Sequence, residues 1–166
     1  MSNRILGIDP GMALMGYGLI DDNEGELSAI DYGALSTPAE QSVPQRLRSL
    51  YRGVCDIIER YQPAEVAVEL FVARNLRTAL MVGQARGVAI LAAANKDLPV
   101  YEYTPLQVKL AVSGYGRGDK RQIQEMVKLQ LGLSSIPEPD DAADALAIAI
   151  CHTGQTRLLE LLAKQR

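Results

Sequence analysis

The sequence is poor in the residues that most often bind zinc or form disulfides. Its 166 residues include only one histidine and two cysteines, Cys55 and Cys151. The cysteines lack metal-ligand spacing, so we expect both to be reduced and buried, as is usual in the cytosol. A single histidine cannot supply a histidine-rich metal site, and any bound metal ion would therefore need oxygen ligands.

Long apolar runs are absent as well. No stretch approaches the ~20 uninterrupted apolar residues that cross a membrane, and the N-terminus lacks the charged-then-apolar order of a signal peptide. We therefore expect a cytoplasmic protein with no membrane partner. Because the chain is 48% hydrophobic, it is not expected to be disordered, and one domain over residues 1–166 is predicted. Residues 154–166 are predicted to form a short helix, to which no function is assigned.

The net charge of −3 argues at first against nucleic acid as a partner. Positive charge is nevertheless concentrated in two segments, residues 71–96, which contain no acid, and residues 104–132. This distribution is typical of a protein that binds a polyanion, although a solvated helix face would produce it too. The basic candidates for nucleic-acid contact are Arg74, Arg77, Lys109, Arg117, Lys120 and Arg121.

The N-terminal segment has the pattern of a buried strand that ends in a carboxylate. An apolar run ends at Asp9, which Pro10 and Gly11 follow, and residues 14–20 then predict a second strand that returns antiparallel. Asp-Pro-Gly is also a common turn in which the aspartate bonds its own backbone, so this motif alone leaves both interpretations open. A buried carboxylate costs several kcal/mol unless it has a partner, which Asp9 would then require.

The rest of the chain alternates strand and helix patterns. Strands are predicted over residues 26–36, 64–70 and 99–103, and helices over residues 44–61, 75–95 and most of the chain after 103. This order predicts an α/β fold with a mixed five-stranded sheet flanked by helices.

Two further segments place carboxylates where a strand or helix pattern is otherwise apolar. One strand pattern ends in Glu69, for which a surface charge is the simpler explanation when it is taken alone. The helix pattern over residues 140–150 contains Asp141 and Asp144, which share one face because they are three positions apart. A favourable interaction with the helix N-terminus explains Asp140, but it does not explain Asp144, which alanines flank.

We expect Asp9, Glu69, Asp141 and Asp144 to converge at one end of the sheet. Such a cluster would repel itself unless divalent cations neutralised it, and its oxygen ligands suit Mg²⁺ or Mn²⁺ better than Zn²⁺. Two ions ~4 Å apart would polarise a phosphate, activate a water and stabilise the leaving oxygen. An acidic centre framed by basic segments therefore predicts phosphodiester hydrolysis on nucleic acid.

Several motifs in a fixed order extend along almost the whole chain. They are GIDPG (residues 7–11), GYG (16–18), VE (68–69), GQARGV (83–88), PVYEY (99–103), QVK (107–109) and DAADALAIA (141–149). Through these motifs the chain resembles the RuvC-type Holliday-junction resolvases, which are crossover junction endodeoxyribonucleases with a ribonuclease H-like fold.

The resemblance implies a role for each matching residue. It makes Asp9, Glu69, Asp141 and Asp144 the catalytic carboxylates that bind two Mg²⁺ ions, with Mn²⁺ as a substitute. It places Lys109 and Lys120 near the cleaved strand. Both lysines could instead occupy ordinary surface positions.

The resemblance also implies partners. It makes residues 75–95, with small residues such as Ala89, the helix of a homodimer whose two sites cut strands of like polarity in a four-way DNA junction. A branch-migration helicase complex is the further partner that it implies. The helix could instead pack its whole apolar stripe on the sheet of one subunit.

The sequence leaves the role of several residues open. Phe71, the only phenylalanine, either stacks on an unpaired base or packs in the core. Asp140 and Asp144 would also share a helix face, although the Asp-Ala-Ala-Asp motif favours Asp141.

Two rival functions are weighed against the nuclease. A non-catalytic junction-binding protein of the same fold would lack one or more of the four carboxylates, and all four are present. An actin-like ATPase shares the opening motif but needs a longer, two-lobed chain. The sequence therefore favours the nuclease.

Overall fold

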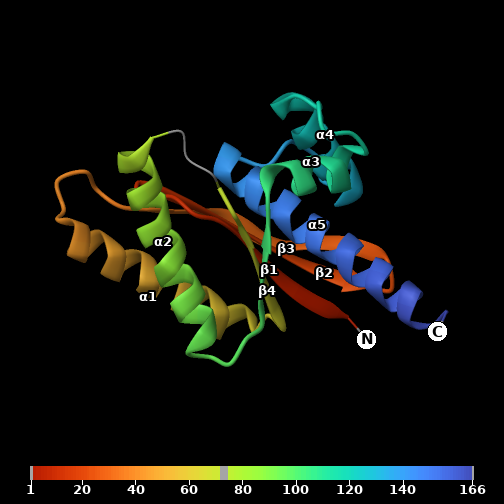
Figure 1. The fold of residues 1–166 in the computed structure, drawn as a ribbon, viewed down its shortest axis with the longest axis horizontal. Helices are drawn as coiled ribbons and strands as arrows, with labels where there is room; N and C mark the ends of the chain where they lie inside the picture. Colours follow the sequence, from red (N-terminus) through yellow and green to blue (C-terminus); the bar gives the residue numbers. More distant parts are fainter. Residues whose placement is uncertain (1, 72–74, 166) are drawn as a thin grey trace.

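The computed structural model describes residues 2–71 and 75–165. The strands are β1 (Asn3–Asp9), β2 (Leu14–Asn23), β3 (Glu26–Ser36), β4 (Glu65–Glu69) and β5 (Val100–Tyr103). The helices are α1 (Val43–Tyr61), α2 (Leu76–Ala94), α3 (Pro105–Ser113), α4 (Lys120–Gln130) and α5 (Asp140–Ala163). Figure 1 shows the strands between two groups of helices.

The five strands form one mixed sheet in the order β3-β2-β1-β4-β5. Strand β2 pairs antiparallel with both β1 and β3, while β4 pairs parallel with both β1 and β5. The predicted mixed five-stranded sheet is therefore confirmed. Because β1 and β4 are parallel neighbours, their carboxyl ends lie at the same edge of the sheet.

Alternate residues of the strands pack into two different hydrophobic cores, one on each face of the sheet. Ile5 on β1 and Ala67 on β4 pack with α3, α4 and α5, whereas Leu6 and Val66 pack with α1 and α2. This alternation follows from the two-residue period of a strand. Helices α1 and α2 thus cover one face of the sheet, and α3, α4 and α5 cover the other (Figure 1).

Helices α1, α2, α3 and α4 begin at side chains that cap their first turn. Ser42, Thr104 and Asp119 each accept a hydrogen bond from the backbone three residues later, and a glutamine at that position bonds back to complete a capping box. Asn75 caps α2 in the simpler way, through one bond from the Thr78 backbone. Lys120 therefore stands at the first position of a capped helix.

Most predicted boundaries agree with the structure to within a residue, and two do not. Strand β2 continues to Asn23 rather than ending at residue 20. Residues 154–163 do not form a separate short helix as predicted, because they continue α5 without interruption to Ala163. Among the described residues, no helix is both long enough and apolar enough to span a membrane.

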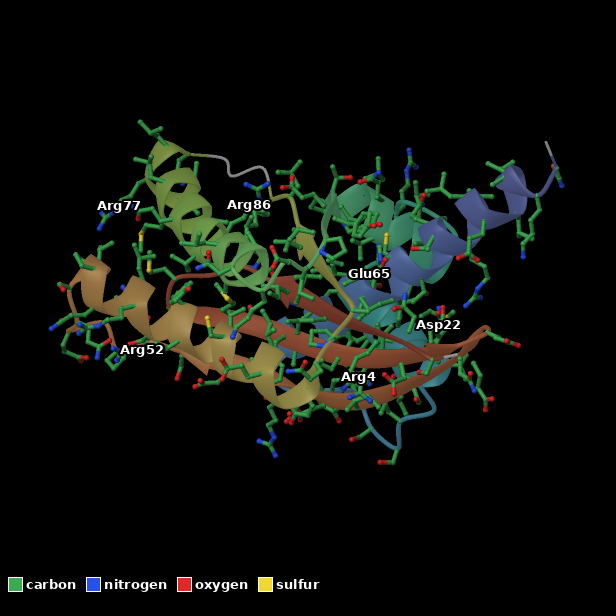
Figure 2. The ribbon with its side chains drawn as sticks, turned by 90° about the horizontal axis from the view of Figure 1, so that it is seen from below. Arg4, Asp22, Arg52, Glu65, Arg77 and Arg86 are labelled. Atoms are coloured by element: carbon green, nitrogen blue, oxygen red, sulfur yellow. The ribbon has the colours of Figure 1, made fainter. Side chains whose placement is uncertain are left out.

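The only histidine anchors α5 to the sheet. His152 is buried, with its Nε2 2.8 Å from Oε2 of Glu65 and its Nδ1 2.6 Å from the hydroxyl of Tyr103. Glu65, labelled in Figure 2, opens β4, and Tyr103 closes β5. These hydrogen bonds fix the position of α5 relative to the two strands.

Candidate active site

Strands β1 and β4 deliver one carboxylate each to the same edge of the sheet. Asp9 and Glu69 are the last residues of the two strands. In the parallel register Ile8 pairs with Val68, and Asp9 and Glu69 are the residues that follow this pair, so the two acids lie side by side at the strand ends. Both lie on the face that α5 covers, because Ile5 and Ala67, which are an even number of positions earlier, pack toward α5.

Glycines allow α5 to lie directly on the strands that carry Asp9. A Cβ on Gly7 would lie 2.1 Å from the carbonyl oxygen of Ala145, and one on Gly16 would lie 2.0 Å from that of Asp141. Gly16 is also the β2 partner of Asp9. The first turn of α5 therefore contacts the backbone beside Asp9, an approach that any larger residue at these positions would prevent.

Electrostatic effects show that all four predicted carboxylates are gathered there. Burial, followed by the neighbouring Glu69, Asp144 and Asp141, raises the pKa of Asp9 to about 9. Burial also raises the pKa of Glu69, although a hydrogen bond shared with Asp9 and the charge of Lys109 oppose this. Asp9 and Glu69 therefore share a proton in a buried place, which compensates for part of the crowded negative charge.

Asp144 has a cation beside it. Burial raises its pKa, and the ammonium of Lys120 opposes that rise. Burial lowers the pKa of Lys120 in turn, but Asp140 and Asp144 outweigh this and raise it overall. The Nζ of Lys120 lies 3.1 Å from Oδ2 of Asp140 and 3.9 Å from Oδ2 of Asp144.

The donor set fits hard divalent cations. Carboxylate oxygens crowded in a partly buried place are the ligands that Mg²⁺ and Mn²⁺ accept, and a cation would relieve their repulsion. Within residues 2–71 and 75–165, no three His, Cys, Asp or Glu side chains are already arranged around a common metal position. Asp9 is close enough to the other three acids for their charges to raise its pKa, and the oxygens would have to turn toward an ion on binding.

A cavity of about 250 Å³ opens beside these acids. The charged residues that line it are Glu69, Asp144, Lys109 and Lys120. The apolar side chains of the cavity wall are Pro105, Val108, Ile123 and Ala147. Two acidic and two basic residues thus line one space, in which a phosphodiester would find both candidate metal ligands and candidate cationic donors.

The remaining predicted contact residues that the structure describes are not among those that line this cavity. Arg77, labelled in Figure 2, is exposed on α2, Arg117 is exposed before α4, and Arg121 pairs with Glu125 over 3.1 Å. Arg74 falls outside the described residues. The interpretation that Phe71 packs in the core is wrong, because Phe71 is 45% exposed just beyond Glu69.

Helix α2 requires a correction. Ala89 is fully buried against the protein's own sheet, together with Ala85, and does not face outward as the dimer interpretation supposed. The opposite face of the helix is exposed at Leu80, Gly83 and Gly87. The small residues of α2 therefore divide between two faces, and only the second face is free to meet a partner.

Two features of the site were missed by sequence reasoning. Gly7 and Gly16 were taken only as parts of motifs, although glycines on paired strands that end in an acid are a signal of close backbone approach. Asp140 was considered as a charge at the helix N-terminus and as an alternative to Asp141, but not as a partner of Lys120, which it contacts. No signal in the sequence alone identifies that contact.

The family model described as crossover junction endodeoxyribonuclease RuvC matches residues 5–152. The chain belongs to the RuvC family. The RuvC relative from Chloroflexus aurantiacus is 63% identical over 150 residues, which cover 90% of this chain and 92% of the relative. The RuvC relative from Desulfitobacterium hafniense is 60% identical over 156 residues, with 93% and 94% covered.

The RuvC family also provides a structural counterpart. The solved structure of RuvC from T. thermophilus in complex with a Holliday junction substrate has a TM-score of 0.90 and 34% sequence identity, with 94% of this chain and 96% of that chain covered. The expected ribonuclease H-like fold is thereby confirmed. Crossover junction endodeoxyribonucleases are enzymes of DNA recombination and repair, and this family implies dependence on a divalent metal ion.

Proposed function

We propose that this protein resolves Holliday junctions by hydrolysing phosphodiester bonds in two strands of like polarity, with Asp9, Glu69, Asp141 and Asp144 as its metal-binding catalytic residues. The observation that supports the assignment is the burial of Asp9 beside the other acids, which together raise its pKa to about 9. Membership of the RuvC family supports the reaction. A non-catalytic junction-binding protein would have no need to retain all four acids at such an electrostatic cost.

The four carboxylates would hold two Mg²⁺ ions, for which Mn²⁺ would substitute. Bound ions of this kind polarise a phosphate, lower the pKa of a water and stabilise a leaving oxygen. The chain's own residues would orient the strand: Lys109 and Lys120 line the same cavity as Glu69 and Asp144, where their ammonium groups would bind phosphate oxygens. They would thereby hold the scissile bond against the acids.

Phe71 is proposed to stack on an unpaired base near the junction centre. It is exposed and follows Glu69 by two residues, so it stands at the edge of the proposed site. Arg74, Arg77, Arg117 and Arg121 are proposed phosphate contacts, because they belong to the two basic segments of the chain.

A homodimer completes the proposal. Leu76, Leu80 and Leu91 are large apolar side chains exposed along the α2 face that also contains Gly83 and Gly87. Such a face suits close contact with a second copy of the same helix. Two sites in a symmetric dimer would cut two strands of a symmetric junction. A branch-migration helicase partner and a cytoplasmic location remain predictions from the family and the sequence.

The deciding experiment is cutting of a synthetic four-way junction by the purified protein. Each of the four strands is labelled in turn, and products are compared in Mg²⁺, in Mn²⁺ and in EDTA. We expect nicks at symmetric positions in two strands of like polarity, only with the divalent metal, and no cutting of a linear duplex of the same sequence. Binding of the junction without cutting in either metal would favour the non-catalytic function.

A further inference from the structure

Lys120 has two acidic neighbours, and the closer one has no role in the proposed metal site. Its Nζ lies 3.1 Å from Asp140 but 3.9 Å from Asp144. A contact of 3.1 Å permits a charge-assisted hydrogen bond, whereas 3.9 Å permits only Coulomb attraction. The ammonium therefore bonds to Asp140 while it stands next to Asp144.

Asp140 has a partner at each of its two carboxylate oxygens. The Nε2 of Gln124 donates to its Oδ1 over 3.1 Å, and Lys120 occupies its Oδ2. The side chain of Gln124 has little freedom because the residue is only 9% exposed. Lys120 and Gln124 are four positions apart on α4, so a single helix face supplies both donors.

This arrangement matters because Asp144 is a proposed metal ligand. An ammonium group bonded to Asp144 would compete with a divalent cation for the same oxygens. If Asp140 lost its charge, the nearest anion for Lys120 would be Asp144. Asp140 offers a closer anchor that leaves the ammonium at the cavity wall, where a phosphate can reach it.

We propose that Asp140 is a positioning residue, which holds the ammonium of Lys120 beside the cavity and away from Asp144. Asp140 contacts neither the metal ions nor the reacting atoms, and it acts only through Lys120. The inference rests on the proposed function, since it assumes that Asp144 binds a metal ion. A simple favourable charge at the N-terminus of α5 is the competing explanation.

The test compares Asp140→Asn, which keeps the shape and removes the charge, with Asp140→Glu, which keeps the charge. Metal binding is measured without DNA as the rise in thermal midpoint with Mg²⁺ concentration, and cutting is measured as the single-turnover rate at saturating protein. We expect Asp140→Asn to need about fivefold more Mg²⁺ in both measurements, the size of an exposed ion pair. Asp140→Glu should restore the wild-type concentration.

The same change is then made in a Lys120→Met background. If Asp140 acts through Lys120, Asp140→Asn should have no further effect on the Mg²⁺ requirement there. Glu40→Gln, which removes an exposed acid elsewhere, is the matched charge control and should change nothing. An equal shift in both backgrounds, or none in either, would overturn the proposal.

Failure of the underlying function would be recognised separately. In that case the unmodified protein would neither cut a junction in Mg²⁺ nor gain thermal stability from the ion. A protein that did both, but whose Asp140→Asn variant matched it at every Mg²⁺ concentration, would retain the proposed function and refute the positioning role alone.

Discussion

The proposed function requires each of the four acids, Asp9, Glu69, Asp141 and Asp144, for junction cutting. We expect Asp9→Asn, Glu69→Gln, Asp141→Asn and Asp144→Asn to slow junction cutting by about a thousandfold or more, since each removes a proposed metal ligand. Junction binding in metal-free buffer should persist, or tighten as negative charge leaves the site. Cutting rates and gel-shift affinities of the four variants check this.

The same series decides between the two neighbouring aspartates at the start of α5. Asp140→Asn should keep cutting at high Mg²⁺, because Asp140 only holds Lys120. If Asp140→Asn were inactive and Asp141→Asn active, the assignment of the helix acids would be wrong.

Stability without metal should fall as pH rises. A carboxyl whose pKa is raised in the folded state, as for Asp9 and Glu69, holds a proton that the unfolded chain releases above its ordinary pKa. Stability is therefore greatest below the unfolded pKa and is lost as pH rises through the folded one, which for Asp9 is about 9. We expect the thermal midpoint in EDTA to drop by ~5 °C between about pH 5 and about pH 9.

Two comparisons isolate the cause. Asp9→Asn should flatten the pH dependence and raise the thermal midpoint at alkaline pH, whereas Asp56→Asn, which alters an exposed acid on α1, should leave it unchanged. Excess Mg²⁺ should restore stability at alkaline pH in the unmodified protein only. An identical pH profile for Asp9→Asn would contradict the explanation.

The two cavity lysines should affect the chemical step more than binding. We expect Lys109→Ala and Lys120→Ala to slow single-turnover cutting by about 10- to 100-fold at saturating protein, because each removes a cationic donor beside the acids. Lys128→Ala, on α4 but in a different groove, serves as the control. Wild-type rates for both cavity variants would show that these lysines are ordinary surface residues with no role in cutting.

The position of α5 against the sheet depends on Gly16 of β2, which has no side chain. Gly16→Ala would place a Cβ 2.0 Å from the carbonyl of Asp141, so the first turn of α5 must move away from β2. We expect a loss of roughly 2 kcal/mol in stability and a weaker response to Mg²⁺. The matched control is Gly154→Ala in the same helix, where a Cβ meets nothing within 4 Å, and which should stabilise by about 0.5–1 kcal/mol. Urea unfolding with and without Mg²⁺ measures both variants.

The same elements show what the sequence can predict. The order of strands, and the acids Asp9 and Glu69 at their ends, follow from apolar runs whose termination is local information. The contact between Gly16 and Asp141 joins residues far apart in the chain, so no local pattern contains it. Ala89 was misplaced because small side chains suit both a sheet and a partner helix, and composition does not distinguish the two faces.

For the whole molecule, the exposed face of α2 should determine whether the protein dimerises and therefore whether it cuts two strands of a junction or only nicks one. We expect Leu80→Glu to give monomers that nick a junction without resolving it, since a buried unpaired charge opposes helix contact. Leu129→Glu alters a similarly exposed leucine on α4 and should leave assembly intact. Sedimentation velocity of both variants provides the measurement, and a monomeric wild type at micromolar concentration would exclude the dimer.

The contact between α5 and the glycines of β1 and β2 has an evolutionary consequence. Backbone touches backbone there, so the spacing between the helix acids and the strand acids does not depend on the volume of any side chain. A relative at 34% identity has the same architecture, with a TM-score of 0.90. We expect this fold to tolerate amino-acid substitutions at other positions as long as these glycines are unchanged.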